Sequence, residues 1–513
     1  MIKLPLTLVL LCACSDMVSA LPAQMQADHL DPQTPDTTVS TSDKQFRFGL
    51  AAIASATSNN QVPFWMRSNQ AGSMPLQGPS ISFIGDIGRD YSKVRKGKLA
   101  DWGVYLEPRL NIGKGSQLLL IETYAKGRLG IFQLKAGRSR DIMGLVDSTL
   151  SSGAFSISGN SLGIPKVELS IPEFWDLPLL KGVIAVKGNF AHGWLGNVDV
   201  KNVDVNEVKT YFHQKSFYAR FGKPSWKLKL FAGFNHQVFW GNEREINGQK
   251  FKLSPSETYK YVIFGKGYGG PGMGIPRSKI GNHLGSIDQA VEFTTKSKKI
   301  LVYHQFLYDV GGLYHLNNVK DGLFGISVAN KETDPSAFFQ LNKIVFEYLN
   351  TKSQGGEIDA KITPSGDEDY YNNFIYTKGW TYKGENLGNP LLTSRKYARK
   401  DLPVYLQEYF INNRISAFHV SAETAVRDWS IVVKAAYSLN YGTYGTSPWG
   451  HSLSSIRIPS KPPYFQEERQ LSTFLSASKK MRQNMTLTFA VALDNGSLLY
   501  NSTGGSVKLS KQW

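Results

Sequence analysis

Hydrophobicity that alternates with a period of two residues recurs along most of this chain and constrains its fold more than any other feature. Between Trp226 and Phe234 every second residue is apolar, and Lys227, Lys229, Phe231 and Gly233 lie between them. Because side chains of a β-strand point alternately to opposite faces, one face of such a segment is apolar and the other mostly is not. Three further segments repeat the pattern, namely residues 132–136, 429–437 and 485–493. The sequence therefore predicts strands whose two faces meet different environments.

Soluble β-sandwiches and β-rich enzymes also have alternating strands, but several features favour a membrane barrel. The strand-like segments often reach nine or more residues, their polar faces carry Gly, Ser, Thr and Lys, and aromatic residues recur near their ends. The chain ends at Trp513, and Val507 and Leu509 share its parity, although Lys511 interrupts the apolar face. An aromatic C-terminal residue on an amphipathic last strand is typical of bacterial outer-membrane barrels. We therefore predict an all-β transmembrane antiparallel β-barrel in the cell outer membrane of a Gram-negative bacterium. Its expected partners include outer-membrane lipid, lipopolysaccharide and the barrel assembly machinery.

Residues 1–20 have the features of a signal peptide. Lys3 supplies a basic start, residues 4–11 form an apolar core, and Val18-Ser19-Ala20 is a pattern that signal peptidase cleaves. The two cysteines of the chain, Cys12 and Cys14, both lie in this segment. An alternative is a lipoprotein-like signal in which Cys14 is lipidated. If cleavage follows residue 20, the mature protein has no disulfide and no cysteine metal site.

The remainder divides into two parts by composition. Residues 21–45 are rich in Asp, Pro and Thr, so we expect a flexible N-terminal segment. Residues 46–513 hold the alternating segments and are predicted to form the outer-membrane β-barrel. With about 10 residues per tilted strand plus connections, this length allows roughly 16 to 20 strands, and we expect about 18. No uninterrupted apolar run of about 18 residues follows residue 20, so helical spans are not expected. Three longer stretches are candidate extracellular or lumen-folded loops: 143–169, 242–259 and 355–373.

The balance of charge indicates an anionic partner. Lys and Arg total 58 against 41 Asp and Glu, a net charge of +17. No block of five or more basic residues occurs, and no zinc-finger or RNP-like spacing accompanies the charge, so nucleic acid is not an expected partner. Lipopolysaccharide, phospholipid headgroups and acidic polysaccharide are better candidates.

Two glycine-rich motifs resemble catalytic or cofactor signatures but lack the context that the chemistry needs. Gly159-Asn160-Ser161-Leu162-Gly163 matches the G-x-S-x-G nucleophile elbow, yet Ile164-Pro165 follows where a helix should begin, so a turn is expected. Residues 265–270 match G-x-G-x-x-G after the strand-like residues 261–264, but Pro271 and the glycines beyond it oppose the helix that a dinucleotide site requires. We expect a glycine-rich loop there.

Metal chemistry is equally unsupported. Asp367-Glu368-Asp369 could bind a divalent cation, but a solvated acidic loop is the default interpretation. The nine histidines show no H-E-x-x-H or comparable spacing. We therefore expect no enzyme activity, no cofactor and no metal.

The more informative clusters combine aromatic, basic and amide side chains. Residues 64–70, 191–194 and 235–242 each place a flat ring beside hydrogen-bonding groups, and sugars present apolar ring faces and hydroxyl edges that suit such a combination. The alternative is that these tryptophans belong to the membrane-interface girdle and that Arg138, Arg140 and Asp141 are charged residues lining the lumen. The candidate polysaccharide-binding residues are Trp65, Arg67, Arg138, Arg140, His192, Trp194, His236 and Trp240.

Several stretches, with the exported leader and the barrel length, resemble a known family. The stretches are 137–140, 191–194, 237–241, 303–306 and 370–391, of which the last is the most specific, with its Tyr371-Asn372-Asn373, Gly379-Trp380-Thr381-Tyr382 and Gly388-Asn389-Pro390. Over residues 46–513 the chain is similar to the outer-membrane capsule assembly protein Wzi family. The resemblance implies an eighteen-stranded barrel that is not itself the export channel and a lectin that holds capsular polysaccharide at the cell surface. It also implies a small periplasmic helical element, for which residues 21–45 offer no obvious match.

Three functions follow from these observations, in order of support. The first is a non-enzymatic barrel that binds capsular or other acidic surface polysaccharide, with capsule attachment implied by the resemblance. The second is a sugar- or anion-selective porin, because polar lumen faces and basic residues also suit an anion-preferring pore. The third is an outer-membrane hydrolase, which needs a nucleophile or carboxylate pair that does not stand out. Conductance in a planar bilayer separates the first two.

Overall fold

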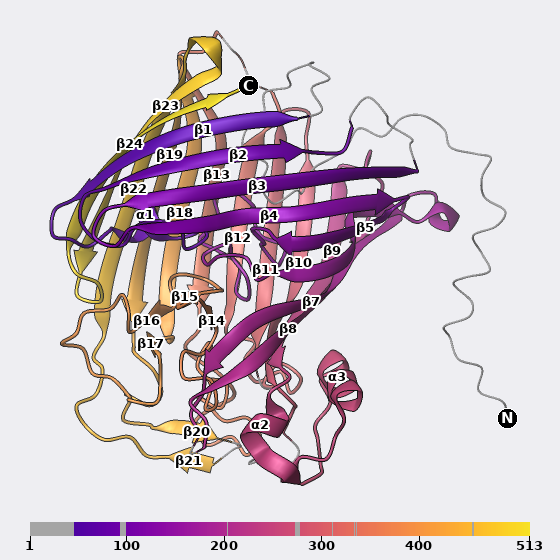
Figure 1. Cartoon of the computed structure of the whole chain (residues 1–513), viewed down its shortest axis with the longest axis vertical. Coiled ribbons are helices and arrows are strands. Elements are labelled where there is room, and N and C mark those ends of the chain that lie inside the picture. The colour runs from indigo at the N-terminus through magenta and orange to yellow at the C-terminus, as the bar shows by residue number, and fades with distance from the viewer. Residues whose placement is uncertain are drawn as a thin grey trace. The chain divides into compact units, whose positions relative to one another are not determined.

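The computed structural model describes residues 46–92, 99–202, 204–271, 278–309, 311–332, 334, 336–453 and 456–513. Eighteen strands form one antiparallel sheet that closes on itself, because β1 (Arg47–Thr57) pairs with both β2 (Ser80–Arg89) and β24 (Ser502–Gln512) (Figure 1). The predicted eighteen-stranded barrel is confirmed. The other wall strands are β3 (Ala100–Ile112), β4 (Gln117–Leu129), β5 (Phe132–Arg138), β6 (Lys166–Asp176), β7 (Ile184–Asp199), β8 (Glu207–Phe221), β9 (Leu228–Trp240), β10 (Asn282–Thr294), β11 (Lys298–Tyr308), β12 (Gly322–Asn330), β13 (Phe339–Asn350), β18 (Ile415–Val426), β19 (Trp429–Asn440), β22 (Glu468–Lys480) and β23 (Met485–Gly496).

The predicted signal peptide (1–20) with Cys14, and the predicted flexible segment (21–45), lie outside the described residues. Three two-stranded sheets stand apart from the barrel wall, within its longer connections. They pair β14 (Thr381–Tyr382) with β15 (Glu385–Asn386), β16 (Thr393–Ser394) with β17 (Phe410–Asn412), and β20 (His451–Leu453) with β21 (Ile456–Ile458).

The connections differ in length between the two ends of the barrel. Those at the end that holds Arg47 and Gln512 are short, such as residues 130–131 and 427–428. The longest connections all lie at the opposite end, here called the loop end: residues 58–79, 139–165, 241–281, 351–414 and 441–467. Outer-membrane barrels have short periplasmic turns and long extracellular loops. The loop end is therefore the cell-surface end, and the three predicted loop stretches fall in its connections, except that β6 already begins at Lys166.

The wall strands turn their apolar side chains outward and their polar side chains into the lumen. In β23 the rings and methyl groups of Phe489, Val491 and Leu493 are exposed on the outer surface, whereas Asp494 is buried inside. An outer face that meets lipid tails must be apolar, because hydrocarbon offers polar groups no hydrogen bonds. The last strand follows the same rule, and its Trp513 is exposed as the sequence predicts.

The helices are short and lie in the connections. They are α1 (Phe64–Arg67), α2 (Glu243–Asn247) and α3 (Pro255–Phe264), with 3₁₀ turns η2 (Pro178–Leu180), η3 (Gly248–Lys250) and η4 (Arg482–Asn484). None of the helices in the described part of the chain has the length and apolarity to span a bilayer.

Residues 261–264 belong to α3, so their expected strand character is wrong. A capping box starts the helix: the Ser254 hydroxyl accepts from the Glu257 amide at 3.4 Å, and the Glu257 carboxylate accepts from the Ser254 amide at 2.9 Å. Gly265 ends the helix in a left-handed conformation at φ 57°. These two end signals outweigh the β propensity of the residues between them.

The residue types of Asp494-Asn495-Gly496 predict a hairpin turn after the alternating segment 485–493, but β23 continues through Gly496, so that turn is misplaced. Asp494 pairs in the ladder with Ser502, and its carboxylate accepts from the Phe64 amide of α1 at 2.8 Å. The turn therefore lies in residues 497–501. A long-range contact with α1 keeps Asp494 in the strand, and the local sequence does not contain that information.

Candidate functional site

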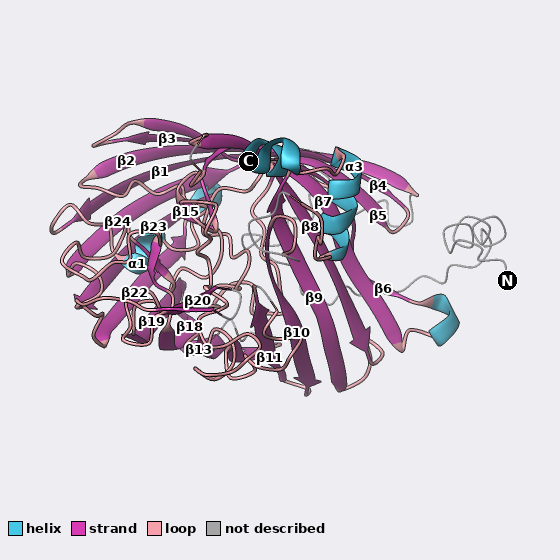
Figure 2. Cartoon of the chain, turned by 90° about the horizontal axis from the view of Figure 1, so that it is seen from below, coloured by secondary structure: helices cyan, strands magenta, loops and turns pink. Residues whose placement is uncertain are grey.

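The β5–β6 connection (139–165) enters the barrel and crosses its lumen, and Figure 2 shows loop segments inside the ring of strands. Its Leu145 amide donates to the Asp288 carboxylate of β10 at 2.8 Å. Glu347 of β13 accepts from the Ser151 hydroxyl and the Ser152 amide, both at 2.6 Å. Because β13 lies across the ring from β5, these contacts anchor the connection, here called the plug, to the opposite wall.

A second connection packs against the plug from the loop end. In the β13–β18 connection (351–414), the Trp380 indole donates to the Ser156 carbonyl of the plug at 2.8 Å. The Trp380 ring stacks on Phe239 of β9 with centroids 4.3 Å apart. The Tyr371 hydroxyl donates to the Phe155 carbonyl. Both aromatic side chains are buried, so the two connections form one packed layer within the barrel.

Buried carboxylates join the loop-end connections to one another. Asp321 accepts from the amides of Ser353 and Gln354 at 2.9 and 2.7 Å and from the Tyr370 hydroxyl at 3.0 Å. Burial raises the pKa of Asp321 to about 6. Burial likewise raises the pKa of Asp369 to about 6. The loop surface is thus held by hydrogen bonds to carboxyl groups whose pKa lies above the usual value for aspartate.

Glu368 plays the same part between the β11–β12 and β13–β18 connections. It is fully buried, and its carboxylate accepts from the amides of Gly311 and Gly312 at 2.8 and 2.6 Å and from Asn318 at 2.7 Å. It belongs to the acidic run that was considered as a cation site and expected to be a solvated loop. Burial shows that Glu368 is not solvated, because its oxygens bind protein donors.

The eight predicted site residues fall in three separate places. Trp65 and Arg67 occupy α1, which also lies inside the barrel. The Trp65 indole is buried and donates to the Ser472 carbonyl at 3.1 Å, and its ring lies 4.9 Å from His419. The Arg67 guanidinium lies over the Tyr397 ring at 3.7 Å. Trp65 is therefore a packing residue of the interior.

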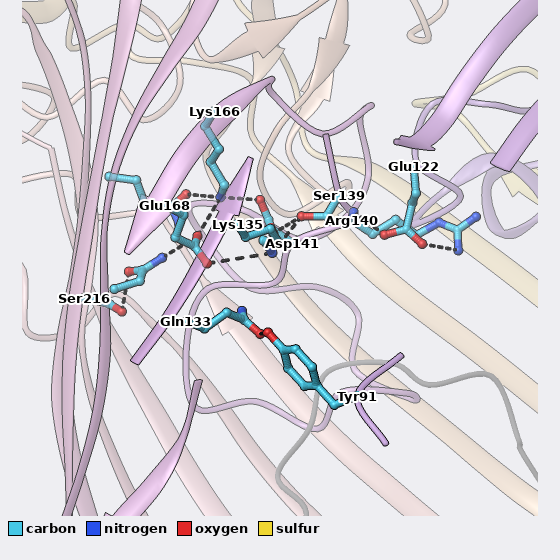
Figure 3. A network of polar contacts seen from close by, with 12 residues as sticks. Tyr91, Glu122, Gln133, Lys135, Ser139, Arg140, Asp141, Lys166, Glu168 and Ser216 are labelled. Carbon is cyan, nitrogen blue, oxygen red and sulfur yellow. Dashed lines mark hydrogen bonds and ion pairs between the residues drawn. The ribbon is translucent and has the colours of Figure 1, made fainter. Parts of the chain in front are cut away.

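Arg138 and Arg140 lie where β5 ends and the plug begins. Arg140 pairs with Glu107 and, at 3.5 Å, with Glu122, and Arg138 donates to the Tyr382 hydroxyl at 3.1 Å. Arg140 borders a charged network on the lumen wall (Figure 3). This arrangement is the one expected of charged residues that line a lumen.

Lys166 stands at the centre of that network. Its ammonium lies 2.5 Å from Asp141 and 3.2 Å from Glu168, and Lys135 lies within 3.8 Å of both carboxylates (Figure 3). Two cations therefore face two anions where β5, β6 and the plug meet. Because the charges balance, no buried charge of this group is left unpaired, and the network fixes the base of the plug.

The other four predicted residues come together on the outer face of β7–β9. His192 and Trp194 share the parity of the lipid-facing Phe190, and His236 and Trp240 share the parity of Phe234. At the loop end this face is covered by α3, which Figures 1 and 2 show beside β7 and β8. The sequence did not predict that a loop helix covers the outside of the wall.

Tyr259 of α3 is the centre of this aromatic cluster. Its ring stacks on Trp240 with centroids 4.7 Å apart and meets His192 edge-on at 5.9 Å. His192 also meets Trp194 edge-on at 5.1 Å. Trp240 is buried by this packing, whereas Trp194 keeps 43% of its surface exposed. Trp194 is therefore the most exposed ring of the four.

The histidines beneath α3 form a directional pair. His283 Nε2 lies 2.8 Å from the Ile280 carbonyl and must donate to it, so its Nδ1 is the acceptor for His236 Nε2, which lies 2.8 Å away. His236 Nδ1 then has no partner among the described residues. The pair supports α3 against the wall, because both rings are buried.

Glu243 follows Trp240 at the start of the same connection. Its carboxylate accepts from the Gly241 amide at 3.0 Å, and burial raises its pKa to about 7. Sequence reasoning missed this residue and Tyr259. The helix-start signal Ser254-Pro255 with Glu257 was present and would have placed Tyr259 on a helix.

The two glycine motifs have no catalytic context in the structure. Gly159 has φ 72° and lies in the plug, where no helix follows Ser161, as expected for a turn. Gly265 is the C-cap of α3 rather than the start of a helix. Within the described ranges, no group of three or more His, Cys, Asp or Glu side chains is placed to hold a metal ion.

Comparison with known proteins decides the family. The model for the family described as capsule assembly protein Wzi matches residues 82–495, most of the barrel. The chain belongs to the capsule assembly protein Wzi family. The resemblance noted in the sequence is thereby confirmed, and the protein is an outer-membrane barrel.

One solved structure shows the same fold. A Wzi from Escherichia coli, described as an outer-membrane protein involved in group 1 capsule assembly and as a carbohydrate-binding β-barrel, aligns with a TM-score of 0.53 at 12% identity. The alignment covers 91% of this chain and 84% of that one. OccK11 (OpdR) of Pseudomonas aeruginosa aligns over 91% of this chain and 95% of its own, with a TM-score of 0.43 and 8% identity. None of the curated proteins matches the sequence.

Proposed function

We propose that this Wzi-family barrel is a non-enzymatic lectin that holds capsular polysaccharide at the cell surface. The observation that carries the proposal is the packed layer at the loop end, in which the plug and the β13–β18 connection are hydrogen-bonded to each other and to the far wall. A surface held in this way stays in place when a polymer binds, so little conformational entropy is lost. The carbohydrate binding described for the Escherichia coli protein supports the same function.

The plug also argues against a porin. An anion-selective pore needs a continuous water-filled path, whereas the plug crosses the lumen from β5 to β13. The net charge of +17 then serves attraction of an acidic polymer rather than conduction. Among the eight candidates, the exposed Trp194 is the ring that we assign to sugar stacking, with His192 beside it.

Capsule retention on cells tests this proposal. A strain that makes capsule but lacks this protein should release polysaccharide into the medium, and the wild-type chain should return it to the cell surface. Trp194→Ala should restore retention only in part. Trp240→Phe is the matched control, because it keeps an aromatic ring beneath Tyr259 on the same wall. Full retention by the strain without the protein would contradict the proposal.

A further inference from the structure

A polar cavity of about 140 Å³ lies inside the barrel between the plug, the β1–β2 connection and β19. Its wall carries hydroxyl and amide side chains, namely Asn69, Gln70, Ser148, Thr149, Ser151 and Ser158. One water needs about 10–15 Å³ on this scale, so the cavity holds roughly ten water molecules. That number is close to the count of non-hydrogen atoms in one pyranose sugar.

The cavity is lined by one ammonium group that makes no direct ion pair, although the carboxylates of Glu347 and Asp147 lie near it. Asp147 lines the cavity, but its carboxylate already forms an ion pair with Lys343 at 3.2 Å. It also accepts hydrogen bonds from the Leu150 amide and the Ser327 hydroxyl, both at 2.9 Å. Lys434 of β19 also lines it, and its ammonium lies 5.4 Å from the centroid of the Trp65 ring. Within the described ranges, Lys434 forms no ion pair. The cavity therefore offers one ammonium surrounded by hydrogen-bonding groups.

We propose that this cavity binds the carboxylate-bearing sugar unit of an acidic saccharide, a ligand of the size and charge of one hexuronic acid. The carboxylate would pair with Lys434, and the sugar hydroxyls would meet the serine, threonine and amide side chains of the plug and the β1–β2 connection. A neutral sugar leaves Lys434 without a direct ion pair, because the nearby carboxylates of Asp147 and Glu347 are bound by other donors. A dianion brings a second charge that Lys434 cannot pair. This site lies inside the barrel and is separate from the Trp194 surface.

Isothermal titration of the full-length protein in detergent micelles tests the proposal with D-glucuronate, D-glucose and acetate as probes. Glucuronate should bind at least about tenfold more tightly than glucose, because one charged hydrogen bond contributes that much. Acetate should bind weakly, because it lacks the hydroxyls. An oligosaccharide that ends in glucuronate should bind as well as the free sugar if the natural ligand is a chain end, and less well if it is a free sugar.

Two variants and a control complete the test. Lys434→Met should weaken glucuronate binding about tenfold or more, and Ser148→Phe, which fills the cavity, should abolish it. Lys508→Met removes another inward lysine that does not line the cavity, and it should leave the affinity within about twofold. Equal affinity for glucose and glucuronate, or unchanged binding by both cavity variants with heat-modifiable gel mobility intact, would overturn the proposal. Full capsule retention by the strain that lacks the protein, alongside normal glucuronate binding by the purified protein, would instead count against the surface function alone.

Discussion

Removal of the plug anchors should convert the barrel into a channel. In the double variant Glu347→Ala with Asp288→Ala, the plug loses three hydrogen bonds to carboxylates, from the Ser151 hydroxyl, the Ser152 amide and the Leu145 amide. A hydrogen bond to a charged group contributes about 1.5–3 kcal/mol, so the closed state loses about 4–9 kcal/mol if the three bonds act independently. Since 1.4 kcal/mol corresponds to about tenfold, the open fraction should rise by about a thousandfold or more.

Single-channel current recordings in a planar bilayer measure this change in the open fraction. The wild-type protein should give a quiet baseline, and the double variant should give frequent openings. Glu347→Gln is the milder comparison variant, because its one amide oxygen can replace only one of the two carboxylate oxygens that accept from Ser151 and Ser152, so it should open less often than the double variant. A double variant as quiet as the wild type would refute the anchoring role of these carboxylates. A steady open current through the wild type would refute the closed lumen itself.

Three further predictions concern stability and assembly. Val491→Arg places a charge on the lipid-facing side of β23 and should lower the free energy of unfolding by about 2–4 kcal/mol at midplane depth. Urea titration in lipid vesicles measures this change, and Val491→Leu is the control that should fold normally. Equal stability of the two variants would show that Val491 does not face lipid. Asp321 and Asp369 hold protons up to about pH 6 in the folded loops against about 3.8 when unfolded, so their stabilisation is full below pH 4 and is lost as pH rises through 6. Hydrogen exchange in residues 351–414, corrected for the pH dependence of the intrinsic exchange rate, should therefore show stronger protection at pH 4.5 than at pH 7.5, and Asp369→Asn should reduce that difference. Protection that does not change with pH would contradict the prediction. Trp513→Asp should lower outer-membrane levels of the barrel on immunoblots, and normal levels would argue against a role for the aromatic C-terminus.

The barrel could be predicted because its determinant is local. Period-two hydrophobicity in segments such as 226–234 and 485–493 reports which face meets lipid, and the structure places those apolar residues outside. Chain length allowed roughly 16 to 20 strands, and the family resemblance implied eighteen. The hairpin turn before β24 was predicted at residues 494–496, whereas it lies at residues 497–501. The reason is that Asp494 is held by α1, which is far away in sequence.

The arrangement of the candidate residues was less predictable. The alternation fades in residues 235–240, because the lumen side of β9 packs against Trp380 and the outer side is covered by α3. Both faces are buried there, so the residue types no longer reveal which one points outward. The plug was recognised as a long loop, but its anchors, such as Ser151 with Glu347, join residues separated by 196 positions. Nothing local in the sequence specifies those pairs.

The most direct test of the central claim is the binding of purified capsular polysaccharide to the folded barrel across a salt series. We expect saturable binding that weakens as salt rises, because exposed charges are screened beyond a Debye length of about 8 Å at physiological ionic strength. A salt-resistant part should remain and should fall in Trp194→Ala, because ring stacking on sugar is not screened in that way. Absence of saturable binding at low salt, with the barrel shown to be folded by its gel mobility, would contradict the account.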